Sequence, residues 1–260
     1  MTTSAPDVPM PPLPLRQLVG PVDPAYFDNP TGAPLYHDLP PEAYRSVFDF
    51  GCGCGRTARQ LLQQWSRPER YVGIDVHKGM VDWCAAHLTP LFPTYEFFHH
   101  DVYSPCYAPG NSRQMTAPFP AGDGEFTLVV AHSVFTHLLK RQTEHYLREL
   151  VRVLAPDGVA MTTWFFFDKV GFPFLGEGQD TLIVDEVDFT QAVMYDRQWF
   201  LGAVRRAGLG VRQTLPPKTT PGLQWVVWLE RRTAATEDRF PLGADGAAWL
   251  CGAKREGADG

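Results

Sequence analysis

The sequence predicts an α/β fold built on an open, mostly parallel sheet. From residue 45 onwards, short apolar runs alternate with amphipathic stretches, which is the pattern of strands separated by helices. The run FTLVVA at 126–131 is apolar throughout, as expected for a strand that is covered on both faces. Two later runs, 211–215 and 223–230, are separated by a short connection, so they predict an antiparallel hairpin at one end of the sheet.

The segment before this pattern, residues 1–44, is rich in proline, most densely at 9–14. Proline fixes its own φ angle and lacks an N–H, so a regular helix or strand is not expected there. The aromatic residues Tyr26, Phe27 and Tyr36 indicate that the later part of the segment packs against another element. We therefore expect a partly ordered N-terminal arm over 1–44.

Apolar spacing predicts the elements that follow, in chain order. Strands are expected at 46–50, 71–76, 95–99, 126–131 and 159–166. The first helix follows from apolar residues three and four apart, which are Ala58, Leu61, Leu62 and Trp65, and further helices are expected at 79–88, 138–154 and 200–206. The sequence Pro156-Asp157-Gly158 is typical of a turn that ends a helix, so it separates the third of these from the fifth strand.

The regular alternation lapses between 168 and 197, and glycine and alanine become frequent after Arg232. We therefore expect one domain over 45–232, with a lid insert at 168–197 that covers the substrate, and a weakly ordered tail over 233–260. The insert combines apolar residues with four carboxylates, those of Asp180, Asp185, Glu186 and Asp188. This composition favours a neutral or cationic substrate over an anionic one.

Composition and charge argue against several classes of partner. The chain has 23 basic and 29 acidic residues, a formal net charge of −6, which disfavours duplex nucleic acid because its binding rests on phosphate neutralisation. No apolar run reaches the roughly 18 residues of a membrane-spanning helix, and the proline-rich N-terminus does not resemble a signal peptide. The 5 cysteines do not suggest a disulfide framework. We expect a cytoplasmic protein whose partner is a small molecule.

The strongest motif is the run DFGCGCG at 49–55, between the first strand and the first helix. A glycine-rich turn at the carboxyl end of a strand lets a nucleotide approach the backbone closely. The dinucleotide pattern G-x-G-x-x-G would need a third glycine where this chain has Arg56. Asp49, just before the turn, suits a ligand with an ammonium group better than one with a pyrophosphate.

Two carboxylates follow the next two strands. Asp75 ends the second strand, where a carboxylate can accept hydrogen bonds from both hydroxyls of a ribose. Asp101 follows the third strand, where it could accept from the exocyclic amine of an adenine or could serve only as a loop or helix-cap carboxylate. The combination of the glycine turn with Asp75 is more specific than either feature alone.

The runs DFGCGCG, GIDV, HHDV, FTLVVAHSVFTHL and YLRELVRVLAPDGVAMTTWF resemble the ordered motifs of class I S-adenosylmethionine-dependent methyltransferases of the small-molecule type. The resemblance covers about residues 44–232. It implies a doubly wound, Rossmann-like sheet of seven strands, mostly parallel, whose last strand is antiparallel, and it implies S-adenosyl-L-methionine as cofactor. By position, Asp49, Gly51, Gly53 and Gly55 would surround the methionine part, Asp75 would hold the ribose, Val76, Asp101 and Val102 would meet the adenine, and Ala131 and His132 would lie beneath the sulfonium.

The family's reaction is an attack by a substrate heteroatom on the methyl group of the sulfonium, and it requires no metal. Holding the two reacting atoms in line can contribute up to about 7–11 kcal/mol. We expect O-methylation of a sugar or natural-product hydroxyl, with N-methylation of an amine as the alternative. A hydroxyl needs a base, and the candidate catalytic residues are His132 and His137, which flank the end of the fourth strand. His137 is also explained as part of the turn that opens a helix.

Three other functions stay open at this point. A nicotinamide-dependent oxidoreductase would use a similar sheet, although Arg56 and the terminal hairpin weigh against it. Methyltransferases that act on nucleic-acid bases carry Asn-Pro-Pro-Tyr or Asp-Pro-Pro-Tyr after the fourth strand, where this chain has AHSV at 131–134. A domain that binds the cofactor and transfers nothing is the third. A metal site at Cys52 and Cys54 is not expected, because no further Cys or His pairs follow at ligand spacing.

Overall fold

The computed structural model describes residues 7–20, 22–183, 191–217 and 224–242 of the 260-residue chain. The chain forms two compact units, one made of residues 1–132 and 152–161 and the other of 133–151 and 162–260. Much of the expected lid insert (184–190), the connection of the terminal hairpin (218–223) and most of the expected tail (243–260) lie outside the described residues.

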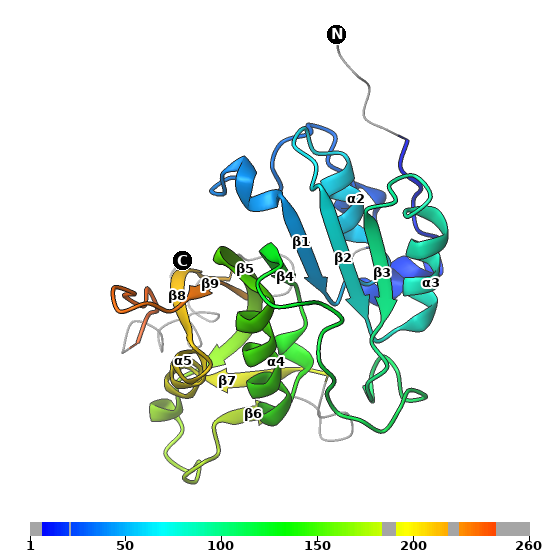
Figure 1. Ribbon diagram of the computed structural model, residues 1–260. Coiled ribbons are helices and arrows are strands. Elements are labelled where there is room, and N and C mark those ends of the chain that lie inside the picture. Colours follow the sequence, from blue (N-terminus) through cyan, green and yellow to red (C-terminus); the bar gives the residue numbers. More distant parts are fainter. Residues whose placement is uncertain (1–6, 21, 184–190, 218–223, 243–260) are drawn as a thin grey trace, which may run out of the picture. The chain divides into compact units, whose positions relative to one another are not determined.

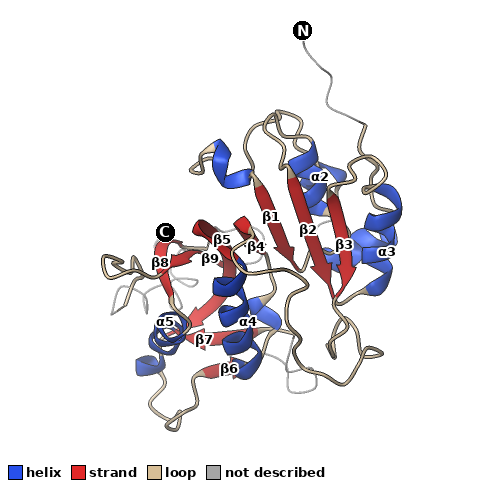
Figure 2. Ribbon diagram, in the orientation of Figure 1, coloured by secondary structure: helices blue, strands red, loops and turns tan. Residues whose placement is uncertain are grey.

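The first unit contains a parallel sheet with the strand order β3-β2-β1-β4 (Figures 1 and 2). Its strands are β1 (Ser46–Phe50), β2 (Arg70–Asp75), β3 (Tyr95–His99) and β4 (Phe126–Ala131). In the register, Val47 of β1 lies opposite Tyr71 of β2 and Leu128 of β4. Every residue of β4 is buried, which confirms the expectation from its apolar sequence. Helices α2 (Arg56–Leu62) and α3 (Lys78–His87) follow β1 and β2, as the apolar spacing predicts.

The N-terminal arm contains regular structure, so the expectation that proline would exclude it is wrong for a few residues. Helix α1 (Leu13–Arg16) begins directly after Pro12 and has a proline in its first turn. Proline is tolerated there, because the first N–H groups of a helix have no intrahelical partner. Short 3₁₀ helices follow at Gln17–Val19, Pro24–Phe27 and Pro41–Tyr44.

Helix α2 holds the arm in place through its polar side chains. The guanidinium of Arg59, a buried residue, donates to the carbonyl of Pro9 at 3.1 Å and pairs with the carboxylate of Asp28 at 2.6 Å. Gln63 donates to the same carboxylate at 3.0 Å. Burial acts to raise the pKa of Asp28, but the hydrogen bonds from Gln63 and Arg59 lower it below its ordinary value. The arm is therefore fixed to the first unit by buried, charge-assisted hydrogen bonds.

The second unit contains the expected terminal hairpin. Strands β8 (Leu209–Leu215) and β9 (Trp225–Arg231) pair antiparallel, and β9 also pairs with β5 (Leu154–Phe167), which runs from the first unit into the second. Helices α4 (Lys140–Val153) and α5 (Arg197–Arg206) complete the expected elements. The prediction of a mostly parallel sheet with an antiparallel last strand is confirmed.

The sheet has nine strands where the resemblance implied seven. The two additional strands lie in the stretch expected to be an irregular insert. Strand β7 (Val193–Asp196) pairs parallel with the end of β5, and β6 (Thr181–Ile183) pairs antiparallel with β7. Both are very short, so neither produces a periodic pattern long enough to be recognised in the sequence.

The predicted turn at Pro156–Gly158 is instead part of β5, because α4 ends at Val153 and the strand begins at Leu154. Glycine is required at position 158 for a reason other than a turn. A Cβ atom on Gly158 would lie 2.8 Å from the carbonyl oxygen of Phe126, so the residue allows two backbones to approach closely.

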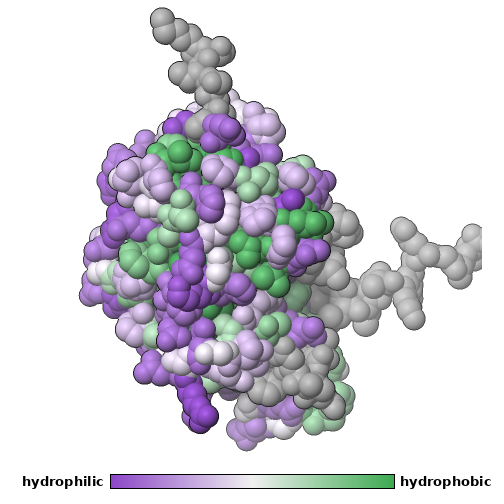
Figure 3. All heavy atoms as spheres, turned by 90° about the vertical axis from the view of Figure 1, so that its right-hand side faces the viewer, coloured by the Kyte–Doolittle hydropathy of each residue, from purple (hydrophilic) through white to green (hydrophobic). Residues whose placement is uncertain are grey.

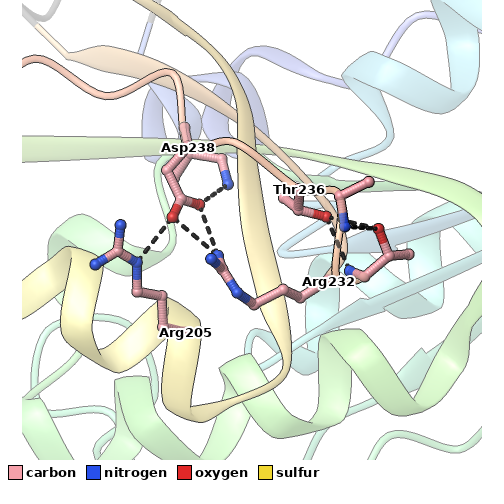
Figure 4. Close-up of polar contacts among 7 residues, drawn as sticks. Arg205, Arg232, Thr236 and Asp238 are labelled. Carbon is pink, nitrogen blue, oxygen red and sulfur yellow. Dashed lines mark hydrogen bonds and ion pairs between the residues drawn. The ribbon is translucent and has the colours of Figure 1, made fainter.

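Asp238 anchors residues that follow β9, in the stretch where the sequence predicts weak order. Figure 4 shows its carboxylate between Arg205 and Arg232, with 2.8 Å to the nearest guanidinium nitrogen of each. It also accepts from the backbone N–H of Val211 at 2.8 Å. The Asp238 side chain is only 3% exposed, so these bonds hold this part of the chain against α5 and the hairpin.

The surface shown in Figure 3 is a mixture in which hydrophilic side chains separate small hydrophobic patches. None of the helices in the described part of the chain has the length and apolar character needed to cross a membrane.

Candidate cofactor and catalytic site

The turn after β1 depends on glycine at three alternate positions. Gly51, Gly53 and Gly55 have φ angles of 81°, 54° and 82°, a region that residues with a Cβ rarely adopt. The N–H groups of Gly51 and Cys52 both donate to the carbonyl of Ile74, at 2.8 and 3.0 Å, which ties the turn to the end of β2. The spacing of the glycines that the sequence singled out is thus a backbone requirement.

Asp75 closes β2 and joins the same turn. One carboxylate oxygen accepts from the N–H of Gly53 and the other from the N–H of His77, each at 2.8 Å. Burial raises the pKa of Asp75, and these two hydrogen bonds counteract the effect in part. A carboxylate has about four acceptor sites, so each oxygen keeps capacity for one further donor, such as a ribose hydroxyl.

Asp49 lies in β1 just before the turn and is buried, with 1% of its surface accessible. It accepts a hydrogen bond from the Tyr71 hydroxyl at 2.6 Å. Burial raises its pKa to about 7, although the bond from Tyr71 and the nearby charge of Arg56 act in the opposite direction. Asp49 is therefore a carboxyl group whose charge can change near neutral pH.

The segment after β3 brings together the residues expected at an adenine. Val76 and Val102 lie side by side because Asn111 donates to both of their carbonyls, at 2.9 and 3.1 Å. Asp101 is exposed, and one of its oxygens accepts from the N–H of Ser112 at 2.9 Å. Sequence reasoning missed Asn111 and Ser112, because both lie in an irregular loop without any recognisable pattern.

The end of β4 presents His132 to solvent. Ala131, the last residue of the strand, is buried, whereas His132 is exposed and the next residue, Ser133, has a φ angle of 58°. Surrounding protein and the charge of Arg56 lower the pKa of His132 to about 4. Because the residue has an exposed surface, water screens part of this effect, and the direction favours the neutral imidazole that a base requires.

His137 lies in the second unit, where it ends the 3₁₀ helix Phe135–His137 and is half-buried. Its backbone N–H donates to the carbonyl of Val134 at 2.9 Å. The residue thus occupies the turn before α4, which agrees with its interpretation as part of a turn that opens a helix. Arg56 is the charged residue whose proximity to Asp49 and His132 the sequence did not reveal.

Comparison with known proteins finds a match over the residues of this site. Residues 47–158, which hold the glycine turn, Asp75, Asp101 and His132, match the model of a methyltransferase domain. Over these residues the chain is similar to a methyltransferase domain.

Solved methyltransferases share the fold. An O-methyltransferase from neocarzinostatin biosynthesis, NcsB1, matches 75% of this chain with 17% identity and a TM-score of 0.50, and this chain covers 51% of it, about half its length. A Haloferax volcanii structure is described as a complex of the Trm112 methyltransferase activator with a candidate methyltransferase. The match spans 73% of this chain and 84% of the Haloferax chain, with 16% identity and a TM-score of 0.51. A Leishmania major S-adenosylmethionine-dependent methyltransferase matches 74% at 14% identity, with 67% of that chain covered and a TM-score of 0.51.

The N-terminal arm covers the glycine turn from outside. A Cβ atom on Gly53 would lie 2.7 Å from a methyl carbon of Val19. Val19 belongs to a small apolar cluster in which Met10, Leu15 and Val19 of the arm pack against the buried residues Phe27, Cys54 and Met80. The described contacts therefore place the arm on the turn.

The cysteines of the glycine turn are buried thiols. Burial raises the pKa of Cys52 well above its ordinary value and that of Cys54 to about 11, so both are neutral at physiological pH. Among the residues that the structure describes, no group of three or more His, Cys, Asp or Glu side chains is arranged to hold a metal ion.

Proposed function

We propose that the protein transfers the methyl group of S-adenosylmethionine to a hydroxyl of a small molecule, a sugar or a natural-product intermediate. The observation that carries the proposal is the joining of Asp75 to the turn at Gly53, with Val76 and Val102 held beside it. This arrangement presents acceptor oxygens, a glycine-rich backbone turn and apolar side chains within one compact unit, which suits an adenosine carrying a cationic tail.

The cofactor contacts proposed from the family pattern fit the residues present. Asp75 keeps acceptor capacity on both oxygens for the ribose hydroxyls. In the described part of the chain, Asp101 uses one carboxylate oxygen for Ser112, which leaves the other for the exocyclic amine of adenine. Gly51, Gly53 and Gly55 add no side chain to the turn, so the methionine part could approach the backbone on a side that Val19 does not cover. The negative charge of Asp49 would favour binding of the ammonium group and the sulfonium of the cofactor.

When bound, S-adenosylmethionine supplies an electrophilic methyl group. The protein's part is to hold the acceptor oxygen in line with that group, exclude water and receive one proton. His132 is proposed as the base, because it follows β4 at the carboxyl end of the sheet and its lowered pKa keeps the imidazole neutral. The imidazole of His132 would receive the proton that the acceptor hydroxyl loses when the bound cofactor supplies its methyl group and keeps the electron pair of the broken carbon–sulfur bond. His137 is the alternative base.

The similarity to solved structures is consistent with a small-molecule acceptor. NcsB1 is described in complex with S-adenosylmethionine and a hydroxylated naphthoic acid. At 17% identity this similarity concerns the fold, so the acceptor of the present chain needs its own test.

The test is incubation of the full chain with S-adenosylmethionine labelled in the methyl group and a panel of alcohols, phenols, amines and thiols. Label is expected on a hydroxyl acceptor, and Asp75→Ala, measured in parallel, is expected to lose transfer together with cofactor affinity. Transfer to amines alone would replace O-methylation with N-methylation. Cofactor binding without transfer to any acceptor class would instead favour a domain that binds S-adenosylmethionine without catalysis.

A further inference from the structure

A cavity of about 590 Å³ opens in the second unit, between the segment that follows β5 and the start of α5. Its wall includes apolar side chains and a few polar ones, among them Lys169, Phe172, Leu175, Asp180, Asp196 and Trp199. A concave site of this volume, with apolar side chains and placed polar groups in its wall, is the usual form of a small-molecule site.

Asp196 fixes the shape of the wall. Its backbone N–H donates to the carbonyl of Asp180 at 2.9 Å. Its carboxylate accepts from the backbone N–H of Lys169 at 2.9 Å and from that of Trp199 at 3.0 Å. Three chain segments of the wall are thus joined to one buried residue. A ligand entering this cavity would meet a preformed site and would lose little affinity to the ordering of loops.

The carboxylates of the wall already have partners, whereas a cationic group keeps free donors. Asp180 pairs with both Lys140 and Lys169, which lower its pKa although burial acts to raise it. Both oxygens of Asp196 accept backbone N–H groups, and the neighbouring Asp168 pairs with Arg197 at 3.1 Å. In the described part of the chain, the ammonium of Lys169 bonds only to Asp180, at 3.4 Å, so it has donors left for a ligand.

The apolar part of the wall is aromatic and continues to the surface. The ring of Phe172 packs edge-on against Phe167 and Phe174, with centroids 5.5 and 6.0 Å away. Phe174 and Val170 are 79% and 86% exposed beside the cavity. Exposed apolar side chains around a concave site favour an apolar ligand, and aromatic rings favour another ring in edge-to-face contact.

We propose that this cavity binds a flat aromatic acid, with its ring against Phe172 and its carboxylate on the ammonium of Lys169. The proposal concerns a ligand of the second unit, and taking that ligand as the methyl acceptor rests on the proposed function. It differs from the sequence-based expectation of a neutral or cationic substrate, because Asp180, one of the carboxylates behind that expectation, is neutralised by two lysines. The others, Asp185, Glu186 and Asp188, lie outside the described residues.

The test is calorimetric titration of the full chain with 2-naphthoate and with the uncharged 2-naphthamide, in the absence of S-adenosylmethionine. We expect the acid to bind at least about tenfold more tightly than the amide, since only the acid forms a charge-assisted bond. Lys169→Gln is expected to abolish this preference by weakening the acid alone, and Lys169→Arg to retain it. Lys140→Gln is the matched control, because Lys140 pairs with the same Asp180 but is not part of the cavity wall.

Equal affinities for acid and amide, an unchanged preference in Lys169→Gln, or no detectable binding of 2-naphthoate would each overturn the proposal. An equal loss in Lys140→Gln and Lys169→Gln would also overturn it, since the effect would then come from the Asp180 network. Because binding is measured without cofactor, the two hypotheses can fail separately. If the protein binds the acid but transfers no methyl group to any acceptor, the proposed function is wrong. If it methylates other acceptors but does not prefer the acid over the amide, the proposal for the cavity is wrong.

Discussion

The carboxylate of Asp75 accepts a hydrogen bond from the backbone N–H of Gly53, with 2.8 Å between Oδ2 and N. The bond joins the end of β2 to the turn that follows β1, so the two features that the sequence singled out are parts of one structure. Asp75 consequently has two functions, to support the turn and to offer its remaining lone pairs to a ligand.

Asp75→Ala is expected to weaken S-adenosylmethionine binding by about 1.5–3 kcal/mol, roughly 10- to 150-fold, because a charged acceptor is lost. It should also lower the free energy of unfolding, since the N–H groups of Gly53 and His77 lose their acceptor. Titration calorimetry and denaturant unfolding measure the two effects separately. Unchanged cofactor affinity in a folded Asp75→Ala variant would contradict the cofactor assignment.

Gly53→Ala is expected to destabilise the protein through two independent effects. A left-handed backbone at a residue with a Cβ costs about 1–2 kcal/mol, and the new atom would lie 2.7 Å from Val19. Adding Val19→Ala should recover the second effect but not the first. Gly110→Ala is the control, since its Cβ would meet nothing within 4 Å. Gly53→Val should abolish cofactor binding as well, and normal binding in that variant would exclude the turn as a contact.

Asp28→Asn is expected to loosen the arm from α2. The substitution leaves the buried guanidinium of Arg59 without its charged partner, which should lower the free energy of unfolding by about 1–3 kcal/mol. Limited proteolysis should then cleave the arm faster than in the unmodified protein. Asp38→Asn removes the same charge at an exposed arm position and should change neither measurement. Equal proteolysis of the two variants would show that the Arg59 pair does not hold the arm.

The sequence predicts those parts of the site that depend on local backbone chemistry. Glycine at 51, 53 and 55 is required by the turn itself. Asp75 is recognisable because it ends the next strand of the chain. Features that depend on tertiary register were not predictable. The bond from Tyr71 to Asp49 requires β1 and β2 to pair in one register, and the contact of Val19 with Gly53 requires the arm to fold back over the turn. Strands as short as β6 and β7 are defined by their pairing rather than by side-chain pattern.

Cofactor affinity is expected to rise with pH, because the pKa of Asp49 is about 7. A group with this pKa is about one-tenth ionised at pH 6 and about nine-tenths at pH 8, so the affinity for a cation that favours the ionised form can rise by up to about tenfold. Asp49→Asn should remove this dependence. Titration calorimetry on both proteins at several pH values cancels any ionisation of the cofactor itself, and identical pH profiles would exclude Asp49 from binding.

The same raised pKa predicts an effect on stability without any ligand. Folded Asp49 binds its proton more tightly than unfolded Asp49, so its contribution to the free energy of unfolding falls as the pH rises from about 4 through 7. Asp49→Asn cannot ionise and should therefore gain stability relative to the unmodified protein between pH 5 and pH 8. Denaturant unfolding at the two pH values measures the difference.

His132→Ala is expected to lower turnover on a hydroxyl acceptor by about 10²–10⁴-fold, with cofactor affinity nearly unchanged, because a general base acts on the chemical step. The lowered pKa makes a further prediction that separates a base from a structural residue. An ordinary histidine loses half of its neutral form near pH 6.5, whereas the lowered pKa of His132 keeps its ring neutral to a lower pH. Turnover should therefore begin to fall at a lower pH than for an ordinary histidine, and NMR titration of the His132 ring should show a pKa lowered in the same direction.

His137→Ala is the matched control for this prediction. His137 ends a 3₁₀ helix in the second unit, so its loss should affect stability more than turnover. If His137→Ala loses turnover and His132→Ala retains it, His137 is the base. If both variants retain turnover, the reaction needs no base from the protein. Positioning of the two reacting atoms would then carry the catalysis, and an amine that is already unprotonated would become the preferred acceptor, because its lone pair can attack without first losing a proton.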